Sequence, residues 1–314
     1  MYNLENEIRS QSMTMPEAYR KVLSKKDFLN LIEFDKPIFI IGNGSSYNSA
    51  LFLSMLFDYN GILTKPMQAS LFNEIMSDSK YNNGTVIAFS QSGESADVIN
   101  AVKNASKKGF KILSITNGEI NSLSKISNAN ISYDAGTELA ITATKTFTGS
   151  LMASLAIYSI ISGNYVDINT ISDSISRLID ESFKIDLNYK FKKAVFLGPG
   201  LFTVTALEGA LKLRETAGID AEGFNSREYE HGYIETLNDD TLVILIGDTN
   251  EKIKKYTSKI IEIDSGHSYI RTGLNHKLIK PIAGVIPLQV LAFKTALLLN
   301  IDPDHPGKLT KVVK

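Results

Sequence analysis

The sequence contains no cysteine. This absence excludes structural disulfides, thiolate nucleophiles and zinc sites built from cysteine. An excess of charge of either sign is also missing, because 33 Lys and Arg balance 34 Asp and Glu and no run concentrates the basic residues. Nucleic acids and anionic membranes are bound by concentrated basic faces, so neither is an expected partner.

No segment has the pattern of an export signal or of a membrane span. The first twenty residues are polar, and the most apolar segment, 282–301, includes Gln289 and Lys294. We therefore expect a cytoplasmic protein in which 282–301 is a buried helix. The 314 residues, 43% hydrophobic and 21% charged, suit a soluble globular protein with room for two domains.

Short apolar runs alternate with helical patterns in the first half of the chain. Strands are predicted at 37–41, 85–89, 111–117 and 131–133, and helices at 50–57 and 96–108. Strands that alternate with helices are typical of βαβ units, so we predict an α/β fold with a parallel sheet.

The second half repeats the spacing of the first. Gly198 follows Gly42 by 156 positions, and Thr241 follows Thr85 by the same interval. Each glycine ends a predicted strand, and each threonine begins one. A shared spacing of two such landmarks indicates a duplicated α/β domain.

The second copy is predicted to contain strands at 194–200 and 241–247, with a helix at 206–216. A polar connection at 164–188, with a helix at 171–178 inside it, separates the copies. We place the boundary near Asp186, which gives domains 1–186 and 187–314.

Two loops in the first half are rich in hydroxyl groups. Ser45 and Ser46 follow the first predicted strand, and Ser90 to Ser95 follow the second. In an open parallel sheet such loops lead into helices whose first amide groups attract anions. The loops therefore predict a phosphate site, to which Thr144 to Thr146 could add donors. The alternative is that these serines are ordinary helix caps and turns.

The corresponding loop of the second half, Ile246 to Thr249, lacks the serines, so the anion site is expected in the first half only. A dinucleotide site is not predicted. Gly42 to Tyr47 begins like a G-x-G-x-x-G fingerprint but has tyrosine in place of the third glycine, and Gly198-Pro199-Gly200 also stops after two glycines.

Three charged residues share one face of the helix predicted at 206–216. They are Glu208, Lys212 and Glu215. They form either a solvated stripe with an i,i+4 ion pair or part of a site near the ligand edge of the sheet.

Two further residues are candidates for chemistry. His231 lies in a polar loop, where it is either simply exposed or a proton carrier. A metal site is not expected, because no second histidine lies at ligand spacing. Lys311 is either solvated or, if buried, an amine that attacks a carbonyl.

Together, these stretches resemble paired SIS (sugar isomerase) domains. The arrangement is similar to the isomerase part of glucosamine-6-phosphate synthase and to the related stand-alone glucosamine-6-phosphate deaminases. The stretches that carry the resemblance are Gly44–Asn48, Ser90–Ser95, Ala135–Glu138, Thr144–Thr148, Ala206–Glu215, Glu228–Gly232 and Asp302–Lys311. The resemblance implies two tandem SIS domains, each a parallel sheet flanked by helices.

The resemblance also implies a role for each candidate residue. Glu215 is the base that moves a proton between C1 and C2 of the open-chain sugar, and Lys212 stabilises the enediol(amine). His231 opens the sugar ring and is contributed across the interface of a homodimer. Lys311 contacts the sugar and can form a Schiff base with the keto form. The substrate-binding and phosphate-binding residues are Ser46, Ser90, Gln91, Ser92, Ser95, Glu138 and Ala143. No metal or organic cofactor is required.

Some features depart from the synthase pattern. The glutamine-hydrolysing domain and its cysteine nucleophile are missing, so we expect no ammonia to be drawn from glutamine by this chain alone. Ala143 stands where a serine is common, and Tyr233 stands where proline is usual. These two departures leave open which sugar phosphate is the substrate.

The expected reaction converts glucosamine 6-phosphate and water into fructose 6-phosphate and ammonia. The alternatives are an isomerase subunit that works with a separate glutaminase, a fructosamine-6-phosphate deglycase, and a non-catalytic sugar-phosphate sensor. Joint retention of Glu215, His231 and Lys311 favours an enzyme over a sensor.

Overall fold

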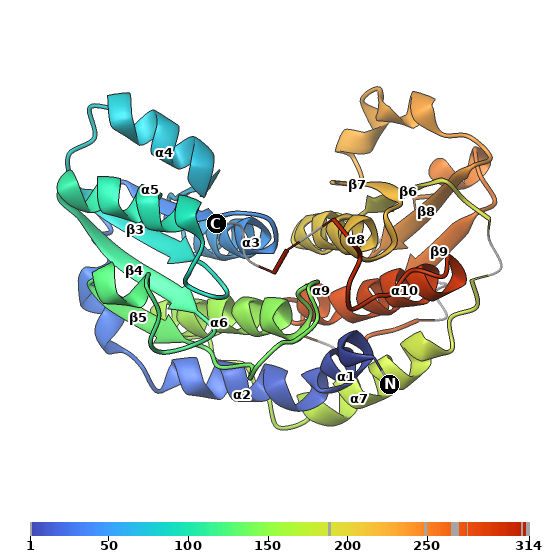
Figure 1. Cartoon of the computed structure of the whole chain (residues 1–314), viewed down its shortest axis with the longest axis horizontal. Coiled ribbons are helices and arrows are strands. Elements are labelled where there is room, and N and C mark those ends of the chain that lie inside the picture. The colour runs from blue at the N-terminus through green and yellow to red at the C-terminus, as the bar shows by residue number, and fades with distance from the viewer. Residues whose placement is uncertain are drawn as a thin grey trace. The chain divides into compact units, whose positions relative to one another are not determined.

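The computed structural model describes residues 2–187, 190–247, 250–264, 270–274, 276–308 and 310–311. The chain forms two compact units, each built on a parallel sheet (Figure 1). We call them the first-sheet unit and the second-sheet unit. The first-sheet unit comprises Met13–Thr137, Lys145–Asp167 and Thr310–Lys314, and the second-sheet unit comprises Met1–Ser12, Glu138–Thr144 and Ile168–Leu309.

The first sheet has five parallel strands in the order β2-β1-β3-β4-β5. Helices α4 and α5 pack on one face, and α3 packs with α6 on the other (Figure 1). The strands are β1 (Ile38–Gly42), β2 (Lys65–Gln68), β3 (Gly84–Phe89), β4 (Phe110–Thr116) and β5 (Ala129–Ser132). The helices are α2 (Gln11–Leu23), α3 (Ser45–Asp58), α4 (Ala69–Asp78), α5 (Ala96–Lys107) and α6 (Lys145–Ser162).

The second sheet has four parallel strands in the order β7-β6-β8-β9. Helices α8 and α10 pack against each other, and Tyr229 and Ile253 help to cover a face of the sheet. The strands are β6 (Lys193–Leu197), β7 (Asp220–Phe224), β8 (Thr241–Ile246) and β9 (Ile260–Ile263). The helices are α1 (Asn3–Arg9), α7 (Ile171–Phe183), α8 (Phe202–Ala217), α9 (Lys280–Ala283) and α10 (Val285–Leu298).

The predicted α/β fold with two parallel sheets is confirmed. The apolar runs at 38–42, 84–89 and 241–246 are strands whose residues are all buried, as expected for a parallel sheet covered on both faces. The segment 282–301 lies mainly in α10. The stretch Lys280–Leu298 is long and apolar enough to cross a membrane, but 83% of its most apolar window is buried inside the protein, as a core helix is.

The compact units divide the chain differently from the predicted boundary. Both sheets lie on their predicted sides of Asp186, because β5 ends at Ser132 and β6 begins at Lys193. Helix α7, however, belongs to the second-sheet unit, together with α1 and the short segment Glu138–Thr144. The boundary at Asp186 stays a prediction.

The same glycine-dependent turn opens both copies. A Cβ on Gly42 would lie 2.5 Å from backbone atoms of Ser46, and one on Gly198 would lie 2.4 Å from the carbonyl oxygen of Phe202. Two residues later, Gly44 and Gly200 have φ of +54° and +53°, the left-handed region that glycine tolerates. Strand and helix can therefore approach closely in each unit, which supports the duplication inferred from the 156-residue interval.

Replacing Gly42 or Gly198 by Ala is expected to lower the free energy of unfolding by about 1–3 kcal/mol, because the new methyl group would overlap backbone atoms. Gly118→Ala is the matched control, since a methyl group on Gly118 would meet no atom within 4 Å. Thermal unfolding of the three variants measures the difference. Equal melting temperatures would contradict the close approach at the two turns.

Candidate active site

The two serine-rich loops lie at neighbouring strand ends in the first-sheet unit. Strand β1 pairs with β3, and Ile41 is opposite Ala88, so both strands end at the same edge. The sheet continues from β1 to β2 on one side and from β3 to β4 on the other. The chain thus leaves these two strands in opposite directions, and such a switch point is where open α/β sheets bind ligands.

The loop after β3 is held in one conformation by its own groups. The hydroxyl oxygen of Ser90 accepts a hydrogen bond from the Gly93 amide, and that of Ser92 accepts one from the Glu94 amide, both at 3.1 Å. Gly93 has φ +68°, and a Cβ there would overlap Asn121. Because a hydroxyl can donate while it accepts, these bonds leave the proton of each serine for a further hydrogen bond.

The remaining predicted phosphate residues lie at helix starts or in the same loop. Ser46 lies in the first turn of α3, Ser95 is the N-cap residue of α5, and Gln91 follows Ser90. Ser46, Gln91 and Ser95 are all partly buried. The side chain of Ser95 makes no cap hydrogen bond. The hydrogen bonds of Ser90 and Ser92 are those of a turn, so the phosphate site at these serines stays a prediction.

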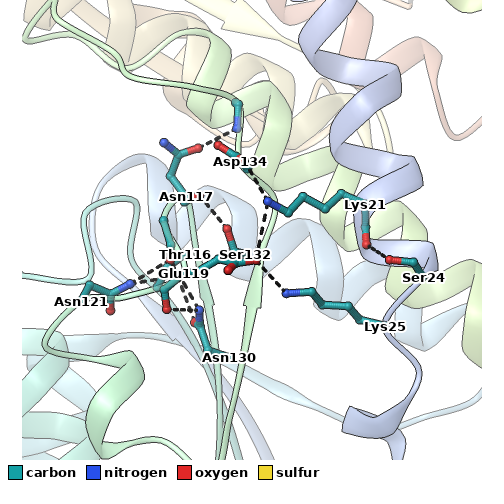
Figure 2. Close-up of polar contacts among 12 residues, drawn as sticks. Lys21, Ser24, Lys25, Thr116, Asn117, Glu119, Asn121, Asn130, Ser132 and Asp134 are labelled. Atoms are coloured by element: carbon teal, nitrogen blue, oxygen red, sulfur yellow. Dashed lines mark hydrogen bonds and ion pairs between the residues drawn. The ribbon is translucent and has the colours of Figure 1, made fainter.

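A polar cluster at the carboxyl ends of β4 and β5 supports this loop (Figure 2). Asn117 follows β4, and its amide donates to the carbonyl of Gln91 at 3.0 Å. Its side-chain oxygen accepts from the amide of Ala135 at 2.8 Å. Lys21 on α2 binds Asp134 at 2.8 Å, and this hydrogen bond lowers the pKa of Asp134. The cluster therefore ties the serine loop to the segment that follows β5.

The face of α8 that carries Glu208, Lys212 and Glu215 is buried, so it is not a solvated stripe. Glu208 is 0% and Lys212 1% exposed. Lys212 Nζ lies 3.2 Å from Oε1 of Glu208 and 2.5 Å from Oε2 of Glu215. Burial alone would lower the pKa of Lys212, but the two carboxylates outweigh it and raise the pKa above its ordinary value. Lys212 is thus held as a cation.

Glu215 differs from its two partners in exposure. Its side chain is 22% exposed, whereas those of Glu208 and Lys212 are sealed. The helix ends two residues later at Ala217, where Gly218 adopts φ +66° and its amide closes the last turn. The carboxylate of Glu215 is therefore partly accessible to solvent, while the buried ammonium of Lys212 fixes the position of its Oε2.

Comparison of the two copies shows how unusual this arrangement is. The positions 156 residues before Glu208 and Lys212 are Phe52 and Leu56 on α3, and both are fully buried apolar side chains. The same core sites are filled by hydrocarbon in one unit and by an ion pair in the other. A buried ion pair is weak evidence for stability, because apolar replacements are often as stable. Its stability alone does not explain why α8 carries it.

The segment 138–144 adjoins the end of α8 within the second-sheet unit. The hydroxyl of Thr216 donates to that of Thr142 at 3.2 Å. Glu138 is buried, and its Oε1 accepts a hydrogen bond from the Thr144 amide at 2.8 Å. This bond joins the two ends of the segment 138–144. Ala143 is partly exposed. The contact of Thr142 with α8 was not predicted from the sequence, because its partner Thr216 is 74 positions away.

His231 is exposed at the end of a short 3₁₀ turn, Glu228–Glu230. The turn is braced by aromatic rings, because Tyr233 packs on Phe224 with ring centroids 4.5 Å apart. Lys311 is partly buried and belongs by its contacts to the first-sheet unit. In the part of the chain that the structure describes, no three His, Asp or Glu side chains gather as metal ligands would.

Comparison with known proteins identifies the family. Residues 31–159 and 189–262 match the SIS domain, and these two segments contain most of the two sheets. The chain belongs to the SIS domain family. Its two tandem SIS domains are the two sheets with their flanking helices, as the sequence predicted.

The curated relatives of these SIS domains are longer enzymes. Glutamine–fructose-6-phosphate aminotransferases of Pyrococcus horikoshii and Thermococcus kodakarensis are each 32% identical over 90% of this chain and 52% of their own length. The chain thus spans about half the length of these relatives.

Solved structures share the fold over nearly the whole chain. A glucosamine-6-phosphate deaminase from Thermotoga maritima has a TM-score of 0.86 at 24% identity and covers 99% of both chains. The C-terminal domain of glucosamine-fructose-6-phosphate aminotransferase from Francisella tularensis has a TM-score of 0.82 at 23% identity, covering 97% of this chain and 98% of that one. These likenesses show the fold of both SIS domains.

Replacing Lys212 by Met is expected to lower the free energy of unfolding by about 3–5 kcal/mol at pH 8, because two carboxylates lose their buried partner. The loss should shrink toward pH 5. A stranded, buried carboxyl has a raised pKa, so the folded variant binds more protons than the unfolded chain and gains stability as the pH falls. Urea unfolding at both pH values measures this.

Lys193→Met is the control for the Lys212 variant. Lys193 pairs with Glu222 at 2.8 Å in the same unit, but their side chains are 25% and 41% exposed. Loss of such a partly solvated pair should cost no more than about 1 kcal/mol. A Lys212 variant as stable as this control would contradict the importance of the buried pair.

Proposed function

We propose that this protein is an aldose–ketose isomerase of the SIS type that deaminates glucosamine 6-phosphate to fructose 6-phosphate and ammonia. The observation that carries the proposal is the buried Lys212 on α8, held between Glu208 and Glu215. A carboxylate beside a fixed cation is the pair that enolisation of a sugar needs: a base for the proton and a positive charge for the developing anion.

In the proposed reaction Glu215 takes the proton from C2 of the open-chain amino sugar. The electrons of the C2–H bond form the C1–C2 double bond, and negative charge develops on the oxygen at C1. The Lys212 ammonium stabilises this charge electrostatically, and its raised pKa keeps it protonated. The oxygen at C1 takes up a proton from solvent, which the later hydrolysis gives back. Glu215 then returns its own proton to C1, which leaves a CH₂OH group at C1 and an iminium group at C2.

Water completes the reaction. It adds to C2 of the iminium, a proton moves to the nitrogen, and the C2–N bond breaks to release ammonia and the ketone. Atoms balance, since one water enters and one ammonia leaves. The oxygen of water becomes the C2 carbonyl oxygen of fructose 6-phosphate.

The phosphate group of the substrate is assigned to the serine loops of the first-sheet unit. Support comes from the adjacent ends of β1 and β3, the helix starts of α3 and α5, and the hydroxyl groups of Ser46, Ser90, Ser92 and Ser95. Gln91, Glu138 and Ala143 are proposed to contact the substrate as well.

His231 and Lys311 are assigned to the steps around the enolisation. The exposed imidazole of His231 is proposed to open the pyranose ring, acting across a homodimer interface. Lys311 is proposed to contact the open sugar and to form a Schiff base with its keto form.

A second candidate is an isomerase that receives ammonia from a separate glutaminase. One observation favours it: the curated relatives are glutamine–fructose-6-phosphate aminotransferases, of which this chain spans about half. The chemistry at α8 would be the same in the opposite direction, with fructose 6-phosphate and ammonia as substrates. The two candidates differ in what supplies or receives the ammonia.

The first test incubates purified protein with glucosamine 6-phosphate and measures ammonia and fructose 6-phosphate together. Both should appear in equal amounts, and Glu215→Gln should lower kcat by on the order of 10²-fold or more, because the base is lost. Glu181→Gln on α7, an exposed carboxylate of the same unit, is the control and should be unchanged.

The other outcomes point to the alternatives. Turnover of fructosamine 6-phosphate but not of glucosamine 6-phosphate would indicate a deglycase. Synthesis from fructose 6-phosphate that is much faster with glutamine and a glutaminase than with free ammonium would indicate the isomerase partner of a glutaminase. Binding of the sugar phosphate without any turnover would leave a sensor and overturn the proposed activity.

The phosphate assignment has its own test. Ser90→Ala and Ser92→Ala should each raise KM for the sugar phosphate several-fold with a smaller effect on kcat, since each removes a hydroxyl donor to the phosphate. Ser77→Ala is the control, because Ser77 lies at the exposed end of α4. A fall in kcat at unchanged KM would contradict a binding role.

A further inference from the structure

The first helix is held in the second-sheet unit by a carboxylate about 300 residues away in sequence. Asp304 accepts hydrogen bonds from the amides of Asn3 and Leu4, each at 2.8 Å and across 301 and 300 positions. The residue before α1, Tyr2, offers no side-chain cap. Asp304 is 7% exposed and satisfies the unpaired amides at the positive end of the helix.

A second buried carboxylate on α1 holds the segment 138–144. Glu7 is 5% exposed, and its Oε1 accepts the amides of Leu139 and Ala140, the latter at 3.4 Å. The next amide, that of Ile141, donates to the backbone carbonyl of Asp304 at 3.4 Å. Glu7 on α1 and the backbone of Asp304 therefore hold three consecutive amides of one loop.

The far end of this loop is held by two buried glutamines. Gln11 donates from Nε2 to Oε1 of Gln289 at 2.7 Å, and Gln289 donates from Nε2 to the carbonyl of Thr144 at 3.3 Å. Thr142 in the middle contacts Thr216, the neighbour of Glu215 on α8. The loop is fixed along its whole length by side chains distant in sequence.

We propose that Glu7 and Asp304 are positioning residues for the reaction. They hold the segment 138–144, which carries Glu138 and Ala143, against the end of α8 that carries Glu215. The inference rests on the proposed function, because it assigns these carboxylates to the same site. Neither carboxylate is placed in contact with substrate, so both act through the backbone they bind.

The two carboxylates bind in different ways, and this makes the proposal testable. Asp304 uses both oxygens, so Asp304→Asn would turn an NH₂ group toward a backbone N–H. Glu7 receives both amides on Oε1, so Glu7→Gln keeps an acceptor there. Asp304→Asn should therefore lose activity as Asp304→Ala does, whereas Glu7→Gln should keep most of the activity that Glu7→Ala loses.

The experiment measures kcat/KM for glucosamine 6-phosphate in Glu7→Ala, Glu7→Gln, Asp304→Ala and Asp304→Asn. The two alanine variants and Asp304→Asn should fall on the order of tenfold to hundredfold, because displacement of the site by about 1 Å has effects of this size. Glu7→Gln should stay near the wild type. Glu5→Ala is the control, since Glu5 lies on the same helix but pairs with partly exposed Arg9 at 2.9 Å.

Binding of inorganic phosphate separates positioning from loss of fold. The serine loops belong to the first-sheet unit, so phosphate affinity measured by calorimetry should be unchanged in every variant. Wild-type kcat/KM in Glu7→Ala and Asp304→Ala would overturn the proposal. Parallel loss of activity and phosphate binding would overturn it too, because it would reveal only unfolding.

Amide hydrogen exchange tests the inference independently of the proposed function. If the wild type releases no ammonia, the deaminase assignment fails, and exchange of the amides at 139–141 then decides alone whether Glu7 holds the loop. Faster exchange of these amides in Glu7→Ala but not in Glu5→Ala would support the conclusion that Glu7 fixes the loop. Unchanged exchange in both variants overturns it.

Discussion

The second-sheet unit depends on one buried ionic interaction, in which Lys212 lies between Glu208 and Glu215 on α8. Removing a charged group from water costs several kcal/mol, and only close contact between opposite charges offsets this. The three side chains must therefore be held together by a rigid surrounding. Helix α10, strand β7 and the loop at 138–144 pack around α8 and provide it. Removal of Lys212 would break both ion pairs at once, whereas removal of either carboxylate would leave Lys212 with the other.

The two copies of the SIS fold carry different polar residues on a shared scaffold. Both use the same glycine turn between strand and helix, at Gly42 and at Gly198. The first copy has the hydroxyl-rich loop after β3 and an apolar helix α3, while the second has the charged helix α8 and no comparable serines after β8. A duplicated scaffold can in this way keep one geometry while each copy loses the residues that the other retains.

The sequence predicts the centre of each sheet better than its edges. Strands β1, β3, β6 and β8 are covered on both faces, so their apolar residues form recognisable runs. Strands β2 and β7 lie at edges and consist of KPMQ and DAEGF, which no hydrophobic pattern marks. Helical spacing placed Glu208 and Lys212 on one face, but burial depends on what covers that face. The roles of Asn117 and Glu7 could not be predicted, because their partners are far away in sequence.

The cap on α1 has a consequence for how the chain folds during synthesis. Asp304, which binds the amino end of helix α1, is made about 300 residues after that helix. At about 5–20 residues per second, the helix waits roughly 15–60 s for its partner. The first-sheet unit has nearly all of its chain by residue 167 and can close much earlier. The loop at 138–144 therefore reaches its final conformation only when Asp304 has left the ribosome, so docking of Asp304 on this loop and on α1 is a late step in folding.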